Sequence, residues 1–352
     1  MTFEIIKKEN HSKWLEITER FSKKDVYYLN AYVSALTLHG DGEPLFAYYR
    51  DENCEIGYVV MKQDIADAPE FRGYLAKEQL FDFSTPYGYG GFLYEGQVTN
   101  SSLHSFFASL QEYCVENRIV SQFIRFHPLL QNQKFVEKFC NILKHKSTIY
   151  MDTTSPEKIM ENMTSKNRNM VRKAMNSEIN IDFDKGENLD AFLKIYNETM
   201  DANQANSYYY FDKTYFRYLI ENLKDNFLFF HARHQGEIIS SAIILFNAHS
   251  AHYHLSGTKR DFRNLAPGNL LLYKVAVWAA EHGISKFHLG GGINQGDNLF
   301  AFKKSFNKNG HLDFYIGSNI FMEDKFSYLI ELREKIDNHF DCNNKFLIQY
   351  RG

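Results

Sequence analysis

The sequence predicts an α/β protein built from two copies of one domain, and a repeated strand–turn–strand pattern is the main reason. The first copy is LFAYYRDENCEIGYVVMK, residues 45–62, and the second is LFFHARHQGEIISSAIILF, residues 228–246. In each copy, aromatic and β-branched residues run up to a polar turn and then alternate again, which is typical of an antiparallel hairpin. Glu55 aligns with Glu237, an offset of 182 residues (237 − 55), or about half of the 352-residue chain.

The segments around the two hairpins also repeat in the same order. Each hairpin follows an aromatic-rich stretch of helical period, and each precedes a long amphipathic segment that leads into a short strand. The two amphipathic segments are residues 104–119 and 269–283, followed by the strands 121–128 and 285–292. A duplicated domain explains this shared order of helix, hairpin, helix and strand better than chance.

The boundary between the two domains is predicted in the middle of the chain. Lys146–Asp152 has the pattern of a strand, and Thr154 with Glu157 three residues later, plus Pro156, marks the start of a helix. We therefore expect domains at 1–147 and 148–352. The total length exceeds the size at which one hydrophobic core usually stops growing.

Composition excludes several classes of protein. The net charge of −3 gives no global attraction to nucleic acid, and the four cysteines show no CxxC spacing that would predict a zinc site or disulfides. No apolar run is long enough for a membrane span, and the N-terminus does not resemble a secretory signal, so we expect a cytoplasmic protein. The three histidines His249, His252 and His254 lack a suitably spaced fourth ligand, so no metal site is expected.

Two segments have the character of anion contacts. A predicted helix after the domain boundary carries Lys166, Arg168, Arg172 and Lys173, which suits either a polyanion or a solvated helix end. Further on, Arg263-Asn-Leu-Ala266-Pro-Gly268 lies between a predicted strand and a helix that begins near Asn269. Free backbone N–H groups at the start of a helix suit a pyrophosphate, although an ordinary loop before a helix has the same pattern.

Several motifs in order indicate a family. They are the segment TPYGYGG at 85–91, the segment FHP at 126–128, the basic pattern K-x-R-x-x-x-R-K-A at 166–174, the loop at 263–268, and L-x-x-F-K-x-x-F at 299–306. Together they resemble the Fem-type (FemABX-like) branch of the GNAT superfamily, which carries two GNAT-like domains in tandem. The resemblance implies two mixed, mostly antiparallel sheets flanked by helices. The loop matches the family's pyrophosphate pattern Q/R-x-x-G-x-G/A in degenerate form, since Ala266 replaces a glycine and Pro267 lacks a donor.

The resemblance also implies an activity. Fem-type proteins transfer an acyl group to an amine, typically an amino acid from aminoacyl-tRNA to a cell-wall precursor peptide, whereas related chains use acyl-CoA. Either donor would be a co-substrate, and no permanently bound cofactor is expected. The acceptor would be a cell-wall or surface-polymer precursor, and a lipid-linked substrate would bring the protein to the membrane surface although it has no transmembrane segment.

The resemblance assigns candidate site residues. Lys303, in preference to its neighbour Lys304, matches the family's lysine and would stabilise an oxyanion or an anionic leaving group. Tyr253 matches a strand position from which the family points a tyrosine into its cleft. Gly291, in the run Gly290–Gly292, permits close approach of backbone to substrate, although a turn from strand to helix would require the same glycines. The candidates for substrate contact are Arg168 and Arg172 in the second domain and Asp82 and Tyr87 in the first.

The chain also departs from the family. Asn203 stands where an arginine usually meets substrate phosphates, no long helical arm is predicted, and no general base is assigned, with Asp82 one candidate. Three functions stay open. Aminoacyl-tRNA use predicts a basic track from Lys166 to Lys173. Acyl-CoA use predicts open backbone N–H groups between Ala266 and Asn269. A binding module without catalysis predicts a site at Lys303 that aromatic side chains block.

Overall fold

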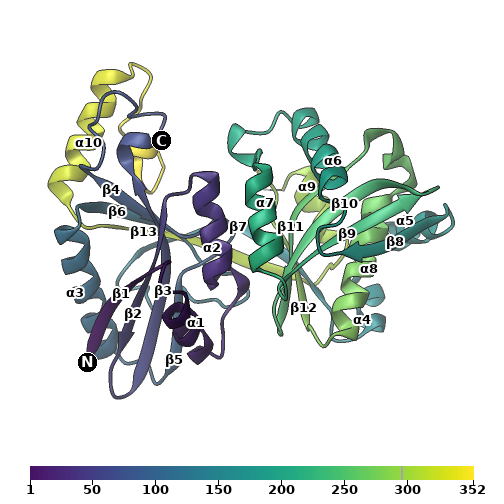
Figure 1. The fold of residues 1–352 in the computed structure, drawn as a ribbon, viewed down its shortest axis with the longest axis horizontal. Helices are drawn as coiled ribbons and strands as arrows, with labels where there is room; N and C mark the ends of the chain where they lie inside the picture. Colours follow the sequence, from purple (N-terminus) through teal and green to yellow (C-terminus); the bar gives the residue numbers. More distant parts are fainter. Residues whose placement is uncertain (295) are drawn as a thin grey trace. The chain divides into compact units, whose positions relative to one another are not determined.

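The computed structural model describes residues 1–294 and 296–352, which form two compact α/β units (Figure 1). Unit 1 consists of Met1–His145 and Phe314–Gly352, and unit 2 consists of Lys146–Asp313. The expected limits of 1–147 and 148–352 therefore differ from the observed units. The difference lies in the last 39 residues, 314–352, because they return to unit 1.

Unit 1 is a mixed sheet with helices around it. Its strands follow the order β1-β2-β3-β4-β6-β13, with β5 paired to β3, and only the β4–β6 pair is parallel among the pairs described. The elements are β1 (Thr2–Lys7), α1 (His11–Arg20), η1 (Val26–Tyr28), α2 (Asn30–His39), β2 (Glu43–Arg50), β3 (Cys54–Asp64), η2 (Ile65–Asp67), β4 (Phe81–Ser84), β5 (Phe92–Gly96), α3 (Asn100–Glu116), β6 (Ile119–Arg125), β13 (His311–Ile320), α10 (Glu323–Ile336) and η5 (Gln349–Arg351).

The return of the C-terminal segment to unit 1 rests on long-range contacts. β13 pairs antiparallel with β6, from Ile316 opposite Arg125 to Ile320 opposite Ser121. Beyond it, α10 packs on a separate apolar cluster that includes Phe71, Val120, Phe326, Leu329 and Tyr350. No local pattern encodes a pairing between residues almost 200 positions apart, so sequence patterns alone predict this segment in the second domain.

Unit 2 contains a sheet of order β7-β12-β11-β10-β9-β8, in which β11 and β12 are parallel and the other described pairs are antiparallel. This confirms the mixed, mostly antiparallel fold class. Its elements are β7 (Asn141–Asp152), which begins in unit 1, then α4 (Pro156–Asn162), α5 (Ser165–Met175), β8 (Ile179–Asp184), α6 (Leu189–Ala202), η3 (Ser207–Tyr209), α7 (Lys213–Asn222), β9 (Phe227–His234), β10 (Glu237–Phe246), β11 (Ser250–Thr258), η4 (Arg260–Leu265), α8 (Pro267–Glu281), β12 (Lys286–Gly290) and α9 (Asn298–Lys304).

Both predicted hairpins are present, as β2–β3 and β9–β10. The helix after the boundary differs from the prediction. Ser155, not Thr154, caps α4 by accepting from the Lys158 amide, and the chain breaks after Met163 before Thr164 caps α5. The basic residues therefore belong to a second, separate helix.

Helices cover both faces of the unit 2 sheet. Side chains alternate along β9, so Phe230 and Ala232 join the apolar cluster under α8, whereas Phe229 and His231 lie on the opposite face, where Phe229 packs against Phe192 of α6. α8 is buried along most of one side because its apolar residues recur at helical spacing. α4 and α5 pack on α8 in turn.

Candidate functional site

The central feature of unit 2 is the buried amine of Lys303. This side chain is 9% exposed, and its Nζ donates a hydrogen bond of 2.6 Å to the carbonyl oxygen of Gly291. The same Nζ lies 5.9 Å from the ring centre of Tyr253. Burial lowers the pKa of Lys303 to about 8, although the charge of Asp297 opposes this shift. The amine is therefore mainly an ammonium at pH 7 but loses its proton far more readily than a surface lysine.

The strand topology explains why these groups meet. In the described residues, β11 and β12 pair in parallel only from Ser250–His252 to Lys286–His288. Tyr253 follows the last paired residue of β11, and Gly291 follows the end of β12. The structure thus brings Lys303, Tyr253 and Gly291 together, although they come from three segments that lie far apart in the sequence.

Glycine is required beside Lys303. A Cβ atom on Gly291 would lie 2.8 Å from the carbonyl oxygen of Ser147, so the backbone could not keep this position with a larger residue. Tyr253 is held on the other side by a hydrogen bond between its hydroxyl and Ser256, and burial raises the pKa of its phenol. The cluster is therefore a preorganised arrangement of one cation and one phenol.

Asp297 belongs to the same site, and the sequence analysis missed it. Its Oδ1 accepts from the amide of Phe300 at 2.7 Å, which caps α9, and its Oδ2 accepts from the amides of Ile293 and Asn294 at 2.7 and 2.8 Å. These backbone hydrogen bonds lower the pKa of the carboxyl group. An aspartate at the start of the F-K helix is a recognisable N-cap signal that could have identified it.

The predicted pyrophosphate loop offers few donors. The amide of Ala266 donates to the Arg263 carbonyl at 3.1 Å, and the amide of Asn269 donates to the Ala266 carbonyl at 3.1 Å. Pro267 has no N–H. Within the described residues, Gly268 is then the one amide of this turn without a backbone partner. Ala266 itself is buried in the left-handed conformation, with φ of 58°, whereas the Arg263 side chain is exposed.

The basic residues of α5 divide into two groups. Lys166, Arg172 and Lys173 are exposed. Arg168 instead donates to the carbonyls of Met160 and Met163, where it closes the C-terminal end of α4. The exposed cations therefore remain available for a polyanion, whereas Arg168 has a structural role.

Helix α5 is also tied to the start of α8. Asn269 Nδ2 donates to Asn167 Oδ1 at 2.7 Å. The basic helix α5 and the start of α8 are therefore in direct contact.

The two candidates of the first domain lie in unit 1. Asp82 is buried, accepts two hydrogen bonds at 2.8 and 2.9 Å from Arg351 Nη2, and accepts a third at 3.0 Å from the Tyr350 hydroxyl. These contacts hold the C-terminal segment in place. Tyr87 lies in the TPYGYGG turn, where its carbonyl accepts from the Tyr32 hydroxyl at 2.7 Å.

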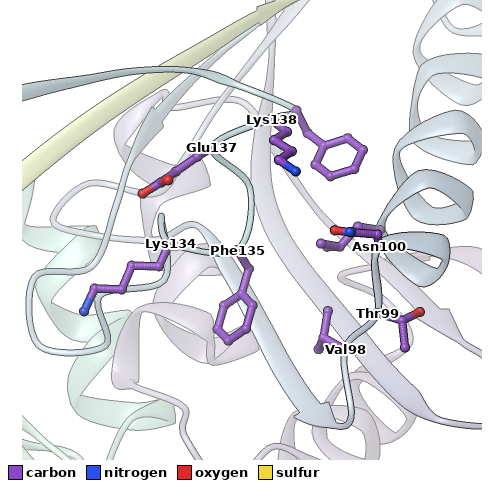
Figure 2. A pocket seen from close by; sticks show the side chains of 9 residues that line it. Val98, Thr99, Asn100, Lys134, Phe135, Glu137 and Lys138 are labelled. Carbon is purple, nitrogen blue, oxygen red and sulfur yellow. The ribbon is translucent and has the colours of Figure 1, made fainter.

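Unit 1 also contains a cavity of about 220 Å³ at the start of α3 (Figure 2). Lys134, Phe135 and Lys138 line it from one segment and Thr99 and Asn100 from another, as labelled in Figure 2. Its charged groups are of mixed sign, since Glu137 also lines it. No residue predicted for chemistry lines this cavity.

A serine–histidine–aspartate chain crosses three strands of unit 2. Ser241 Oγ lies 2.9 Å from His231 Nδ1, and His231 Nε2 lies 2.9 Å from Asp184 Oδ2. The spacing is that of a nucleophilic triad. However, Ser241 and His231 are both 0% exposed, so no substrate can reach the hydroxyl. The chain is a buried polar network that joins β8, β9 and β10.

Comparisons with known proteins agree with this architecture. Residues 160–304 match the acetyltransferase (GNAT) domain family. The structure of FemX is similar, with a TM-score of 0.66 over 93% of this chain and 99% of FemX at 14% identity. L-PGS from Bacillus licheniformis gives a TM-score of 0.55 over 87% and 90% of the two chains at 12% identity. A domain assigned to a lysylphosphatidylglycerol synthetase of Agrobacterium fabrum gives 0.53 over 88% and 91% at 12% identity.

A comparison with curated protein sequences found no match. The family match and the fold nevertheless agree: residues 160–304 match a GNAT acetyltransferase domain, and the chain has a fold similar to that of FemX. This confirms the resemblance inferred from the motifs. In the described part of the chain, no helix combines the length and apolar character needed to cross a membrane.

Proposed function

We propose that this protein transfers an aminoacyl group from aminoacyl-tRNA to an amine of a cell-wall or surface-polymer precursor. The observation that carries this choice of donor is the loop at the start of α8. A coenzyme A pyrophosphate needs several converging backbone donors, whereas the amides of Ala266 and Asn269 are engaged within the loop and Pro267 has none. An acyl donor that does not depend on this loop fits the geometry better.

The chemistry follows from Lys303. The neutral acceptor amine attacks the carbonyl of the aminoacyl ester, a new C–N bond forms, and the C–O bond to the tRNA ribose breaks. The proton that the amine loses ends on the released ribose oxygen. The tetrahedral intermediate carries an oxyanion, which a fixed ammonium stabilises in a site that excludes water. Lys303 fits this task because it is buried, held by Gly291 and mainly protonated at pH 7.

Binding of the tRNA would involve α5. The exposed cations Lys166, Arg172 and Lys173 form a local basic surface on a chain whose net charge is −3. Phosphate contacts from such a surface release counterions, so binding should weaken steeply with salt. The structural neighbours support aminoacyl chemistry, since one is assigned as a synthetase of lysylphosphatidylglycerol, an aminoacylated lipid.

An acyl-CoA-dependent N-acyltransferase is the second candidate. It is favoured by the match to the acetyltransferase domain family, by the free amide of Gly268 and by the exposed guanidinium of Arg263. A single amide and one arginine would bind the pyrophosphate weakly compared with a complete loop.

Calorimetric titration with coenzyme A, acetyl-CoA and a mixed aminoacyl-tRNA pool separates these functions. We expect salt-sensitive binding of tRNA, and transfer to an amine acceptor that falls on the order of 10²-fold in Lys303→Ala. Lys304→Ala is the matched control, because removal of this exposed neighbouring charge should leave transfer unchanged. Saturable coenzyme A binding that is lost in Arg263→Ala would establish the acyl-CoA function instead. If neither coenzyme A nor aminoacyl-tRNA binds, a binding module without catalysis would be favoured.

A further inference from the structure

Asp297 organises the backbone around Lys303. Three N–H groups, those of Ile293, Asn294 and Phe300, converge on its two carboxylate oxygens. Two of them come from the segment that follows β12 and one from the first turn of α9. The carboxylate thus joins the segment that supplies the Gly291 carbonyl to the helix that supplies Lys303.

Gly292 permits this arrangement. A Cβ atom at this position would lie 2.2 Å from Asp297 Oδ1, closer than any real contact, so a side chain here would displace the carboxylate. The glycine run therefore serves two purposes. Gly291 approaches the backbone of Ser147, and Gly292 makes room for the carboxylate.

An aspartate is required at this position for chemical reasons. Both oxygens of a carboxylate accept hydrogen bonds, whereas asparagine has one accepting oxygen and one donating NH₂ group. An asparagine that caps Phe300 would present its NH₂ to the amides of Ile293 and Asn294, and these donors would lose their partner. Asparagine also removes the negative charge that favours the protonated form of Lys303.

We propose that Asp297 is a positioning residue that fixes the Gly291 carbonyl and the Lys303 ammonium in the geometry used for acyl transfer. The inference rests on the proposed function of Lys303. It adds a residue that does not touch the substrate but decides where the ammonium lies and how much of it is charged. The groups that face the amine are Tyr253 from β11, the Gly291 carbonyl after β12, and Asp297 at the start of α9.

The test compares Asp297→Asn with Asp212→Asn. Asp212 is also an N-cap aspartate of unit 2, accepts from the Thr214 amide at 2.7 Å and has a lowered pKa, but it caps α7. The pKa of Lys303 is measured from its ¹³Cε resonance in lysine-labelled protein, assigned by its loss in Lys303→Arg. We expect this pKa to fall below the value of about 8 in Asp297→Asn and to stay unchanged in Asp212→Asn.

Activity gives the second readout. With the donor that the titration selects, Asp297→Asn should lose turnover on the order of 10- to 100-fold with much less change in KM, because the ammonium is misplaced by a fraction of an ångström. The alkaline limb of its pH profile should move to lower pH, which a loss of folding alone would not cause. An unchanged Lys303 pKa would overturn the inference. A shifted pKa with undiminished turnover would also overturn it, because the placement of the amine would then not matter for transfer, whereas full activity of Lys303→Ala would refute the proposed function itself.

Discussion

The burial of Lys303 predicts that replacing this lysine by methionine stabilises the protein at pH 7. Burial lowers the pKa of the amine from 10.5 to about 8. Each pKa unit corresponds to about 1.4 kcal/mol, so the folded state bears a cost of roughly 3 kcal/mol for keeping the charge. Methionine removes this cost and fills similar space, but it loses the charged hydrogen bond to Gly291, worth about 2 kcal/mol. The net gain should be about 1 kcal/mol.

The sign reverses at alkaline pH. Between pH 8 and 10.5 the unfolded lysine still holds the proton that the folded lysine has released, so the stability of the wild type rises with pH. The rise amounts to about 2 kcal/mol between pH 7 and about pH 9.5. The methionine variant lacks this term, so it should be the more stable protein at pH 7 and the less stable one at pH 9.5.

Urea denaturation in a Trp14→Phe background measures the effect in unit 2. The chain has two tryptophans, and Trp278 of α8 would then be the sole tryptophan reporter. Lys304→Met, at an exposed neighbouring position, should show no such pH-dependent difference. If the stability difference between wild type and Lys303→Met does not change with pH, the amine is not buried and its pKa is not lowered.

Three further predictions concern contacts within the two units. Burial alone would raise the pKa of Asp184, but its hydrogen bonds lower this pKa from 3.8 to about 2. The ionised carboxylate should therefore stabilise the folded protein by about 2 kcal/mol above pH 4, and this stabilisation should disappear as pH falls toward 2. Asp184→Asn should remove this acid dependence of stability in urea titrations. Asp82→Ala and Arg351→Ala should each destabilise unit 1 by about 3 kcal/mol. In thermal denaturation, the loss of stability in the double variant should be much smaller than the sum of the two single losses, whereas additive losses would show that the two residues are not coupled. Gly292→Ala should lower the melting temperature and reduce transfer, whereas Gly268→Ala, whose Cβ would meet Thr258 at an ordinary 3.7 Å, should do neither.

Local patterns predicted the parts of this structure that local interactions determine. The hairpins β2–β3 and β9–β10 and the helices α3 and α8 follow from alternation and helical period, which depend on neighbouring residues. The return of β13 to β6 depends instead on partners far apart in the chain, so sequence periodicity could not place the last 39 residues, 314–352, in unit 1.

For the side chains too, sequence patterns predicted some properties, whereas others became apparent only in the folded structure. Lys303 was identified from a motif, but its burial and lowered pKa required the fold. Arg168 and Arg172 look alike in the sequence, yet Arg168 closes α4 through the carbonyls of Met160 and Met163 while Arg172 is exposed. The sequence pattern gives the charges and their spacing, but the break between α4 and α5 decides which cation hydrogen-bonds to backbone carbonyl groups.

The two units share an order of elements but differ in the strand on which the proposed chemistry depends. In both units a helix leads into a strand that pairs in parallel with an earlier one: α3 precedes β6, which pairs with β4, and α8 precedes β12, which pairs with β11. In unit 2, β11 is one continuous strand that carries Tyr253 past the end of its pairing with β12. In unit 1 the segment at 85–91 divides the corresponding strand into β4 and β5, both paired with β3. Unit 1 therefore lacks, among its described strands, the continuous strand on which the Lys303 site depends.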